Sequence, residues 1–196
     1  MKKNNFFLIS IICIGFSSCG FLLNNQRTYY DEFKNTKTYT LKQIVRPTKF
    51  GSEISNATLT YERIVSESSE TLNLYFIVAR STGSFRIEKK GFLKVNDIKF
   101  EIYPETEGTE YNTNQETNIS TTTIKDSTTV KTQYNTDVKS YNWLTDKFIV
   151  RFTPEMTSSI LKTDEITFRF YFGPTPATFI IKGANLKQVQ KLLKNG

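Results

Sequence analysis

The sequence predicts a mainly β protein, an antiparallel β-sandwich or open barrel with a short helix near residues 154–161 and a C-terminal amphipathic helix. Of the 196 residues, 14% are aromatic, with 16 Phe and 10 Tyr against 9 Gly and 5 Pro, and aromatic side chains favour strands. Apolar and polar residues alternate along many short segments, which is the period of a half-buried strand. Short turn signals separate these segments, as expected of antiparallel neighbours.

The first 18 residues have the features of a secretory signal peptide. Lys2 and Lys3 precede an apolar stretch, Phe6 to Phe16, of about 11 residues and then small residues. That stretch is shorter than the roughly 20 apolar residues of a transmembrane helix. We therefore predict a signal peptide at 1–18, a tether at 19–30 and a single β-rich domain at 31–196.

Ser17, Ser18 and Cys19 match the lipobox, which reads Leu, two small residues and Cys; Phe16 stands where Leu is usual. The N-terminus thus resembles bacterial lipoproteins. The resemblance implies that Cys19 becomes the first mature residue, carries the lipid and anchors the protein to a membrane. It implies a place in the bacterial cell envelope, with the outer membrane preferred over the inner. Cys13 leaves with the signal peptide, so no disulfide can form.

The segments from 39 to 102 alternate in the manner of strands. One of them, 72–79, is apolar on both faces, so we expect it to be central and covered on both sides. The apolar positions that share a face are Tyr39, Leu41 and Val45; Leu59, Tyr61 and Val65; Leu72, Leu74, Phe76 and Val78; and Ile98, Phe100 and Ile102.

Residues 104–146 are rich in Thr, Asn, Glu and Ser and poor in aliphatic residues. A disordered linker is one interpretation. We prefer a long hairpin for the second half, because Val130, Tyr134 and Val138 alternate with polar residues and Thr suits an extended backbone. Asp126 and Ser127 are predicted to form its turn. Residues 104–117 are predicted to be a loop.

Order returns after Trp143, with a strand face at Phe148, Val150 and Phe152. Thr153 and Pro154 then predict the start of a two-turn helix that ends at Leu161. The core is expected to include residues from all parts of the domain. We predict strand faces at Phe168, Phe170 and Phe172 and at Phe179 to Ile181, a terminal helix at 186–194 with Asn185 as N-cap, and Leu74, Phe76, Phe100, Val150, Phe170 and Phe179 in the core.

This order of strands, polar hairpin and short helices resembles that of uncharacterised β-rich envelope lipoproteins. The resemblance carries no diagnostic motif, so it implies an architecture and assigns no functional residue.

The chain lacks the residues that many enzyme mechanisms need. The chain has no His, which excludes His-dependent triads and His-containing metal sites. It has no Gly-x-Gly-x-x-Gly or Walker loop, and we expect no cofactor. Two weak enzyme hypotheses remain, both without supporting motifs. They are Ser-Lys chemistry at Ser159 and Lys162, and acid–base or Ca²⁺ chemistry at Glu101, Glu105, Glu107, Glu110 and Glu116.

Charge is distributed unevenly along the chain. Removing Lys2 and Lys3 from the net charge of +7 leaves +5, and no acidic residue follows Glu165. The terminal helix places its apolar residues on one arc and Lys187, Lys191 and Lys194 on the other. These lysines are a candidate basic contact surface for anionic lipid, glycan or an acidic protein, and nucleic acid is not expected.

The sequence therefore predicts a membrane-anchored lipoprotein that works by binding or as a structural envelope protein, and not as an enzyme. The alternative is an envelope enzyme that uses carboxylate or Ser-Lys chemistry.

Overall fold

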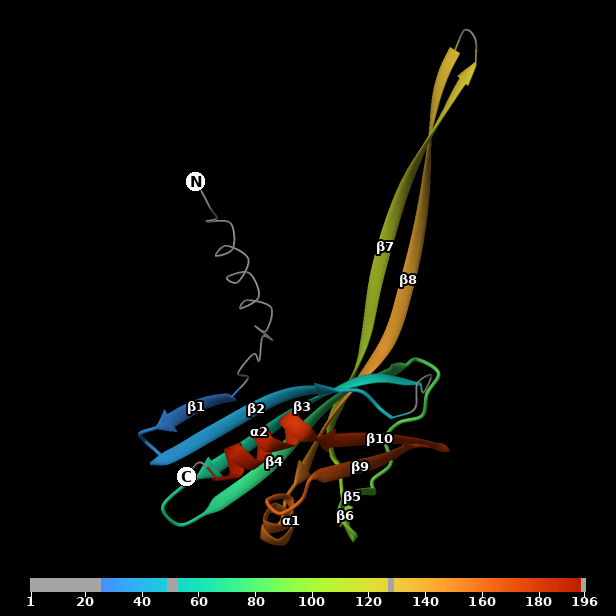
Figure 1. The fold of residues 1–196 in the computed structure, drawn as a ribbon. Helices are drawn as coiled ribbons and strands as arrows, with labels where there is room; N and C mark the ends of the chain where they lie inside the picture. The colour runs from blue at the N-terminus through green and yellow to red at the C-terminus, as the bar shows by residue number, and fades with distance from the viewer. Residues whose placement is uncertain (1–25, 49–52, 127–128, 195–196) are drawn as a thin grey trace, which may run out of the picture.

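The computed structural model describes residues 26–48, 53–126 and 129–194. Two antiparallel sheets pack face to face, and two short helices cover the open sides of the layer between them (Figure 1). The predicted class, an antiparallel sandwich or open barrel with two short helices, is confirmed. One hairpin leaves this body and projects far beyond it.

The first sheet has six strands in the order β1-β2-β3-β4-β8-β7. All neighbours are antiparallel. Its strands are β1 (Gln26–Asp31), β2 (Thr36–Val45), β3 (Ile54–Val65), β4 (Glu70–Ser81), β7 (Glu105–Asp126) and β8 (Thr129–Arg151).

The second sheet has four strands in the order β10-β9-β5-β6, again antiparallel. Its strands are β5 (Gly91–Val95), β6 (Ile98–Ile102), β9 (Glu165–Phe172) and β10 (Thr175–Lys182). Gly91 allows close packing here, since a Cβ atom at this position would lie 2.7 Å from the Phe170 ring. The Thr48 N–H donates to the Thr178 carbonyl at 2.9 Å, which links the end of β2 to β10. The sandwich is thus partly closed along this side.

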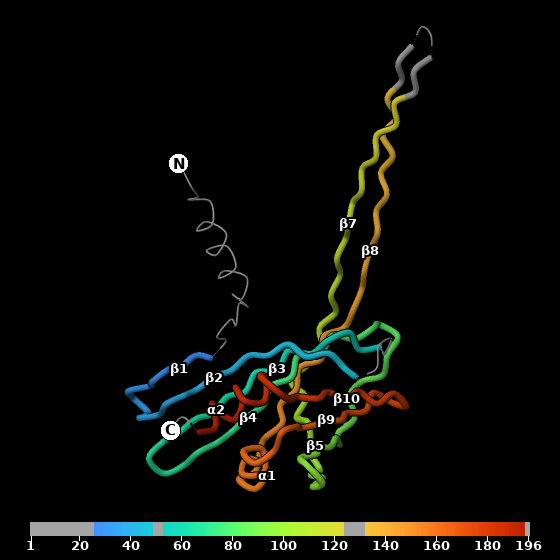
Figure 2. Tube along the Cα trace, viewed as in Figure 1, coloured from blue at the N-terminus to red at the C-terminus, as the bar shows by residue number. Residues whose placement is uncertain are grey.

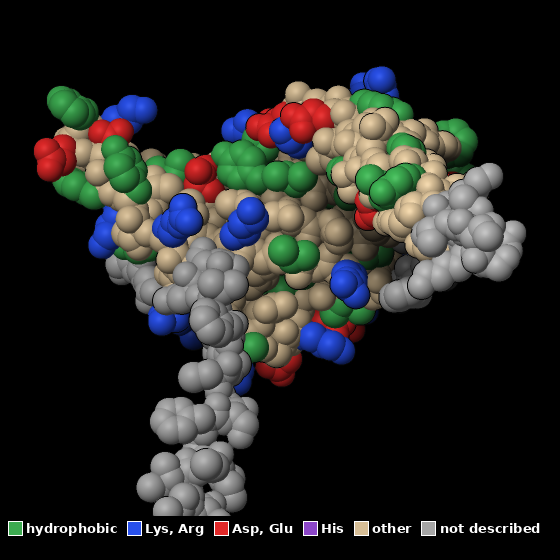
Figure 3. Space-filling view, turned by 90° about the horizontal axis from the view of Figure 1, so that it is seen from above, with side chains coloured by type: hydrophobic (Ala, Val, Ile, Leu, Met, Phe, Trp, Pro, Cys, Tyr) green, Lys and Arg blue, Asp and Glu red, His purple; other side chains and the backbone are tan. Residues whose placement is uncertain are grey.

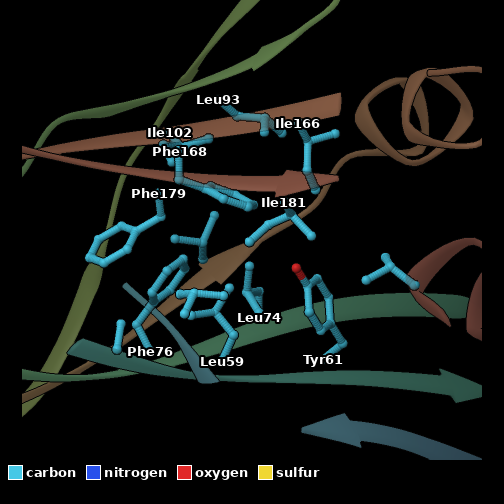
Figure 4. Packing of buried hydrophobic residues seen from close by; sticks show 14 of the residues in the cluster. Leu59, Tyr61, Leu74, Phe76, Leu93, Ile102, Ile166, Phe168, Phe179 and Ile181 are labelled. Carbon is cyan, nitrogen blue, oxygen red and sulfur yellow. The ribbon is translucent and has the colours of Figure 1, made fainter. Parts of the chain in front are cut away.

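The core lies between the sheets and is dominated by aromatic rings (Figure 4). The Phe76 and Phe148 rings stack at 4.9 Å, and the Phe170 ring meets each of them edge-on at 4.9 and 5.0 Å. Such offset and edge-to-face contacts add to the free energy of burial. Of the predicted core residues, Leu74, Phe76, Val150, Phe170 and Phe179 are buried, and Phe100 is partly buried against the same cluster.

The helix α1 (Pro154–Ile160) begins as predicted, with the Thr153 hydroxyl accepting from the Met156 N–H and Pro154 in the first turn. The helix α2 (Gly183–Lys194) buries Leu186, Val189, Leu192 and Leu193, the predicted arc. Its start differs from the prediction, because Gly183 with φ of 59° opens the helix and Asn185 lies inside it.

Polar side chains fasten α2 to the sheets. The Arg63 guanidinium donates to both Glu70 carboxylate oxygens at 2.7 and 3.2 Å and to the Leu192 carbonyl at 3.2 Å. The hydrogen bond from Arg63 lowers the Glu70 pKa. The Gln43 amide donates to the Asn185 carbonyl at 2.8 Å. The terminal helix is therefore an integral part of the body.

Three sequence predictions are wrong or incomplete. Residues 105–117 belong to β7 and are not a loop. The strand β4 is central, but its second face is not covered, since Ile77 is 39% exposed. Residues 26–30, predicted as tether, form the edge strand β1. The long hairpin predicted for the second half of 104–146 is confirmed, since β7 pairs with β8 from Thr117 and Val138 to Asp126 and Thr129. Ser127, of the turn predicted at Asp126 and Ser127, lies outside the described residues.

Candidate functional site

The most prominent feature is the outer half of the β7–β8 hairpin. The strand β4 pairs with β8 only from Trp143 to Arg151, whereas β7 and β8 stay paired out to Asp126 and Thr129. We call residues 113–126 and 129–142 the arm. With a rise of about 3.4 Å per residue, the arm extends roughly 45–50 Å. Its two strands wind about each other as they leave the body (Figure 2).

A buried ion pair marks the base of the arm. The Arg80 guanidinium donates to both Asp146 oxygens at 2.6 and 3.2 Å, and both side chains are almost fully buried. The Thr109 hydroxyl also donates to Asp146, at 2.6 Å. The strand β7 carries an irregularity between Thr106 and Gly108, next to this pair. Bulges bend and twist a strand, so this one helps to set the direction of the arm.

One face of the β7–β8 hairpin carries no charge from position 111 to 123 of β7 and from 132 to 144 of β8; Lys125, nearer the tip, is the next β7 residue of the same parity. Positions directly opposite each other in the register share a face, so odd positions of β7 and even positions of β8 continue the face that Phe148 presents to the core. We call this the uncharged face. Its members are Tyr111, Thr113, Gln115, Thr117, Ile119, Thr121, Thr123, Thr132, Tyr134, Thr136, Val138, Ser140, Asn142 and Leu144.

Large apolar side chains on the uncharged face are open to solvent. Tyr111, Ile119, Tyr134 and Val138 are 56–70% exposed. Seen from above, hydrophobic side chains are scattered over the surface among Lys, Arg, Asp and Glu side chains (Figure 3). The opposite face contains Glu110, Glu116, Asp137 and Lys139, so we call it the charged face.

A second candidate lies on the outer surface of the four-stranded sheet. A hollow of about 240 Å³ is lined by six residues of β5, β6 and β9. Within it, the Phe92 and Tyr171 rings meet edge-on at 6.3 Å, and the Lys99 ammonium sits 3.8 Å from the centre of the Phe92 ring. We call it the basic hollow. Its lining residues are Phe92, Lys94, Lys99, Thr167, Arg169 and Tyr171.

None of the three cations of the basic hollow forms an ion pair within 4.0 Å with a described acidic residue. The hydrogen bond from Lys90 lowers the Glu101 pKa and the Lys99 charge contributes to this, while the Arg169 guanidinium donates to the Thr178 hydroxyl at 3.1 Å. Lys94 lies directly opposite Lys99 in the register, and Arg169 lies directly opposite Phe92. Like charges opposite each other destabilise a sheet. Three cations elsewhere on the surface of the same region are paired. The pairs are Lys90 with Glu101, Lys147 with Glu110 and Arg151 with Glu105.

The lysines of α2 are placed as the sequence predicts. Lys187, Lys191 and Lys194 are exposed, opposite the buried arc of the helix. No ion pair joins them to a described acidic residue. The helix contains no aromatic residue. They therefore offer charge alone, unlike the cations of the basic hollow.

Three of the carboxylates that the sequence singles out form ion pairs on the surface. Glu101, Glu105 and Glu110 each pair with a cation, at 2.6, 2.8 and 2.5 Å, on exposed surface. The hydrogen bonds from Lys90 and Arg151 lower the pKa values of Glu101 and Glu105. A general acid needs a raised pKa. Within 26–48, 53–126 and 129–194, no group of three acidic or Cys side chains is placed to hold a metal ion.

The remaining predicted residues lie apart from both surfaces. Ser159 is in the last turn of α1 and Lys162 follows the helix, joined to it by a backbone hydrogen bond of 3.1 Å. No side-chain hydrogen bond joins these two described residues. Cys19 lies outside the described residues. In the described part of the chain, no helix is long and apolar enough to cross a bilayer.

Sequence reasoning missed both the basic hollow and the uncharged face. The hollow joins residues 92–99 to residues 167–171 through strand register, for which the sequence gives no local signal. The uncharged face had a signal, the absence of charge at odd positions from 111 to 123. Comparisons of the chain with protein-family models, curated proteins and solved structures found no match.

Proposed function

We propose that this protein is a bacterial lipoprotein, anchored in the envelope through Cys19, that binds an acidic glycan in the basic hollow. It works by binding and not by catalysis. The observation that carries the proposal is the group of three cations around the Phe92 and Tyr171 rings, none of which forms an ion pair with a described acidic residue. The anchor rests on the lipobox at Ser17, Ser18 and Cys19.

The chemistry of the basic hollow favours a ligand that is both anionic and ring-shaped. Lys94, Lys99 and Arg169 concentrate positive potential that an anion would neutralise. The Arg169 guanidinium provides a fork that matches a carboxylate or sulfate group. The Phe92 and Tyr171 rings offer an apolar surface on which the C–H face of a sugar packs. The hollow, at about 240 Å³, has room for one such sugar unit at a time.

Several observations disfavour catalysis. The carboxylates of 101–110 are paired and exposed, and the pKa values of Glu101 and Glu105 are lowered. The hydrogen bond that joins the described residues Ser159 and Lys162 runs between their backbones, whereas an activated Ser needs its side chain bonded to a base. A surface that concentrates charge without a reactive group is suited to recognition. The lysines of α2 remain a candidate contact surface for anionic headgroups.

Binding is tested with the full-length protein in a non-ionic polyoxyethylene detergent. The probes are heparin, polygalacturonate, neutral dextran, an anionic lipid vesicle and a DNA duplex. The proposal expects salt-sensitive binding to heparin, polygalacturonate or both, with the preferred anion separating sulfate from carboxylate. Preference for vesicles or DNA, or no binding to either glycan, would contradict it.

The decisive variants compare equal changes of charge at two places. Replacing Lys94, Lys99 and Arg169 together with Gln should weaken glycan binding by at least tenfold. Replacing Lys187, Lys191 and Lys194 with Gln removes the same charge and should weaken it by less than threefold. Phe92→Leu, which keeps the charge, should also weaken binding. Equal losses of glycan affinity in the two triple variants would mean that net charge alone controls binding. This result would overturn the assignment of the glycan site to the basic hollow.

The anchor is tested separately from the ligand. Cys19→Ser should abolish incorporation of a labelled fatty acid and release the protein from the membrane fraction. A Cys19→Ser protein that still takes up the fatty acid would contradict the lipoprotein assignment. This result would leave the glycan assignment unaffected, because that assay uses purified protein.

A further inference from the structure

We infer that the arm is a dimerisation element, and that its uncharged face packs against the same face of a second copy of this chain. This interaction is distinct from glycan binding, because the basic hollow lies on the other sheet. The inference rests on three features of the arm. They are its lack of support from the body, its charge distribution and its size.

The first feature is the lack of support. Among the described strands, none of the body pairs with β8 from Asn142 to the tip, and none pairs with the outer edge of β7. An isolated two-stranded hairpin is at best marginally stable in water. The arm also exposes Ile119, Tyr134 and Val138, which would gain free energy on burial. A partner on this face would supply what the body does not.

The second feature is the charge distribution, which favours a second copy as the occupant. In a two-fold dimer the same surface patch faces itself, so any net charge on the patch repels its own copy. The uncharged face meets that condition, as all fourteen positions from 111 to 123 and 132 to 144 on it are neutral. The charged face does not, because it carries Glu110, Glu116, Asp126 and Asp137 against Lys131, Lys139 and Lys147.

The third feature is size. Two strands spaced about 4.8 Å apart over roughly 45–50 Å present about 500 Å² in projection, and a larger accessible area. A stable interface buries about 800 Å² on each partner. The projected area alone is more than half of this value, and the side chains that stand on the face add accessible area to it.

The side chains at the centre of the uncharged face also suit packing against a second copy. Ile119 lies opposite Thr136, and Thr121 lies opposite Tyr134. β-Branched and aromatic side chains of this kind interdigitate well when two sheets pack about 10 Å apart. The core face of the body uses the same arrangement, so the arm continues the pattern of the sandwich and takes its second layer from another molecule.

The test places one lysine on either face at neighbouring positions. Thr136→Lys charges the uncharged face, and Asn135→Lys makes the same change of charge on the charged face. A second pair, Ile119→Lys and Asn118→Lys, repeats the comparison on β7. All four residues are exposed, so the body should fold in every variant. Circular dichroism and the unfolding temperature check this.

The readout is sedimentation equilibrium of the full-length protein in a detergent whose density matches the buffer. The parent protein should form dimers. Thr136→Lys and Ile119→Lys should raise the dimer dissociation constant at least tenfold, whereas Asn135→Lys and Asn118→Lys should change it by less than twofold. The measurement covers a 100-fold range of protein concentration that ends near the solubility limit. A parent protein that stays monomeric over this whole range would overturn the inference. So would equal effects on the two faces, which would indicate pairing through a strand edge or through the lipid.

Discussion

The two halves of β8 follow the same alternation and have opposite surroundings. From Trp143 to Arg151 the strand lies between β4 and β7, and Phe148 and Val150 are buried in the sandwich. From Thr129 to Asn142 it pairs with β7 alone, and Tyr134 on the same face is 70% exposed. The backbone pattern is continuous, so the difference lies in what covers the face.

The comparison shows that strand formation and core formation are separate properties of this sequence. The body half has Phe148 and Val150 on the face that the second sheet covers, where both are buried. The arm half keeps β-branched Thr and a few apolar residues, which suit an extended backbone, but lacks the continuous apolar stripe of a core strand. Asp146, paired with Arg80, lies close to the point where the body half of β8 passes into the arm half.

The largest effect should come from truncating one aromatic residue in each half of β8. Phe148→Ala should lower the free energy of unfolding by roughly 3–5 kcal/mol, because it leaves a cavity among packed rings. Tyr134→Ala should change it by less than about 0.5 kcal/mol, because the side chain is exposed. Denaturant titration of both variants at low protein concentration measures the difference. Similar losses would mean that the arm contributes to the fold of the body.

The next effect concerns the ion pair at the base of the arm. Asp146→Asn should cost roughly 3–5 kcal/mol, since it leaves the Arg80 cation buried without its counter-charge. Glu105→Gln breaks the exposed pair with Arg151 on the same hairpin and should leave the unfolding midpoint unchanged. Thermal unfolding of the two variants gives the contrast. If Asp146→Asn unfolds at the same temperature as the parent protein, water reaches the ion pair, and the pair is not part of the buried core of the body.

The smallest effect should be a gain in stability. The Tyr61 hydroxyl points into the core and has no hydrogen-bond partner among the described residues (Figure 4). Tyr61→Phe should therefore raise the free energy of unfolding by about 1 kcal/mol. Unfolding at neutral pH measures the gain. A loss of stability would mean that water or another group satisfies this hydroxyl.

The same residue gives a pH dependence. Burial raises the Tyr61 pKa above its ordinary value of 10.0, so the folded state keeps the proton that the unfolded state releases. Stability should fall as pH rises above about 10, because the unfolded state binds fewer protons there. Tyr61→Phe should lose part of this dependence, whereas Tyr134→Phe should not, because Tyr134 is exposed.

Local patterns predicted the body well. Alternation placed Leu74, Phe76 and Phe170 in the core, and Thr153 with Pro154 located the start of α1. Two errors have physical causes. Residues 105–117 look like a loop because no apolar stripe is needed where both faces of β7 meet solvent. The start of α2 was missed because Gly183 adopts a positive φ, which composition does not reveal.

The binding surfaces were less predictable from the sequence. The basic hollow depends on the register between strands, and the uncharged face depends on the absence of charged residues. Lys94 and Lys99 are near neighbours across a tight hairpin, but Arg169 joins them only through the pairing of β5 with β9. The lysines of α2 were recognisable from helical periodicity alone, since one helix holds all three. A surface within one element can be predicted from sequence, and a surface shared among strands requires the fold.

Hydrogen exchange at several protein concentrations tests most directly whether the arm depends on a second copy. Amides of 72–78 and 166–170, in the sandwich, should be protected equally at every concentration. Amides of 113–123 and 132–142 should exchange quickly in dilute protein. They should become protected as the protein concentration rises, because dimerisation stabilises the paired strands of the arm. Arm amides whose protection is the same at all concentrations would contradict the account.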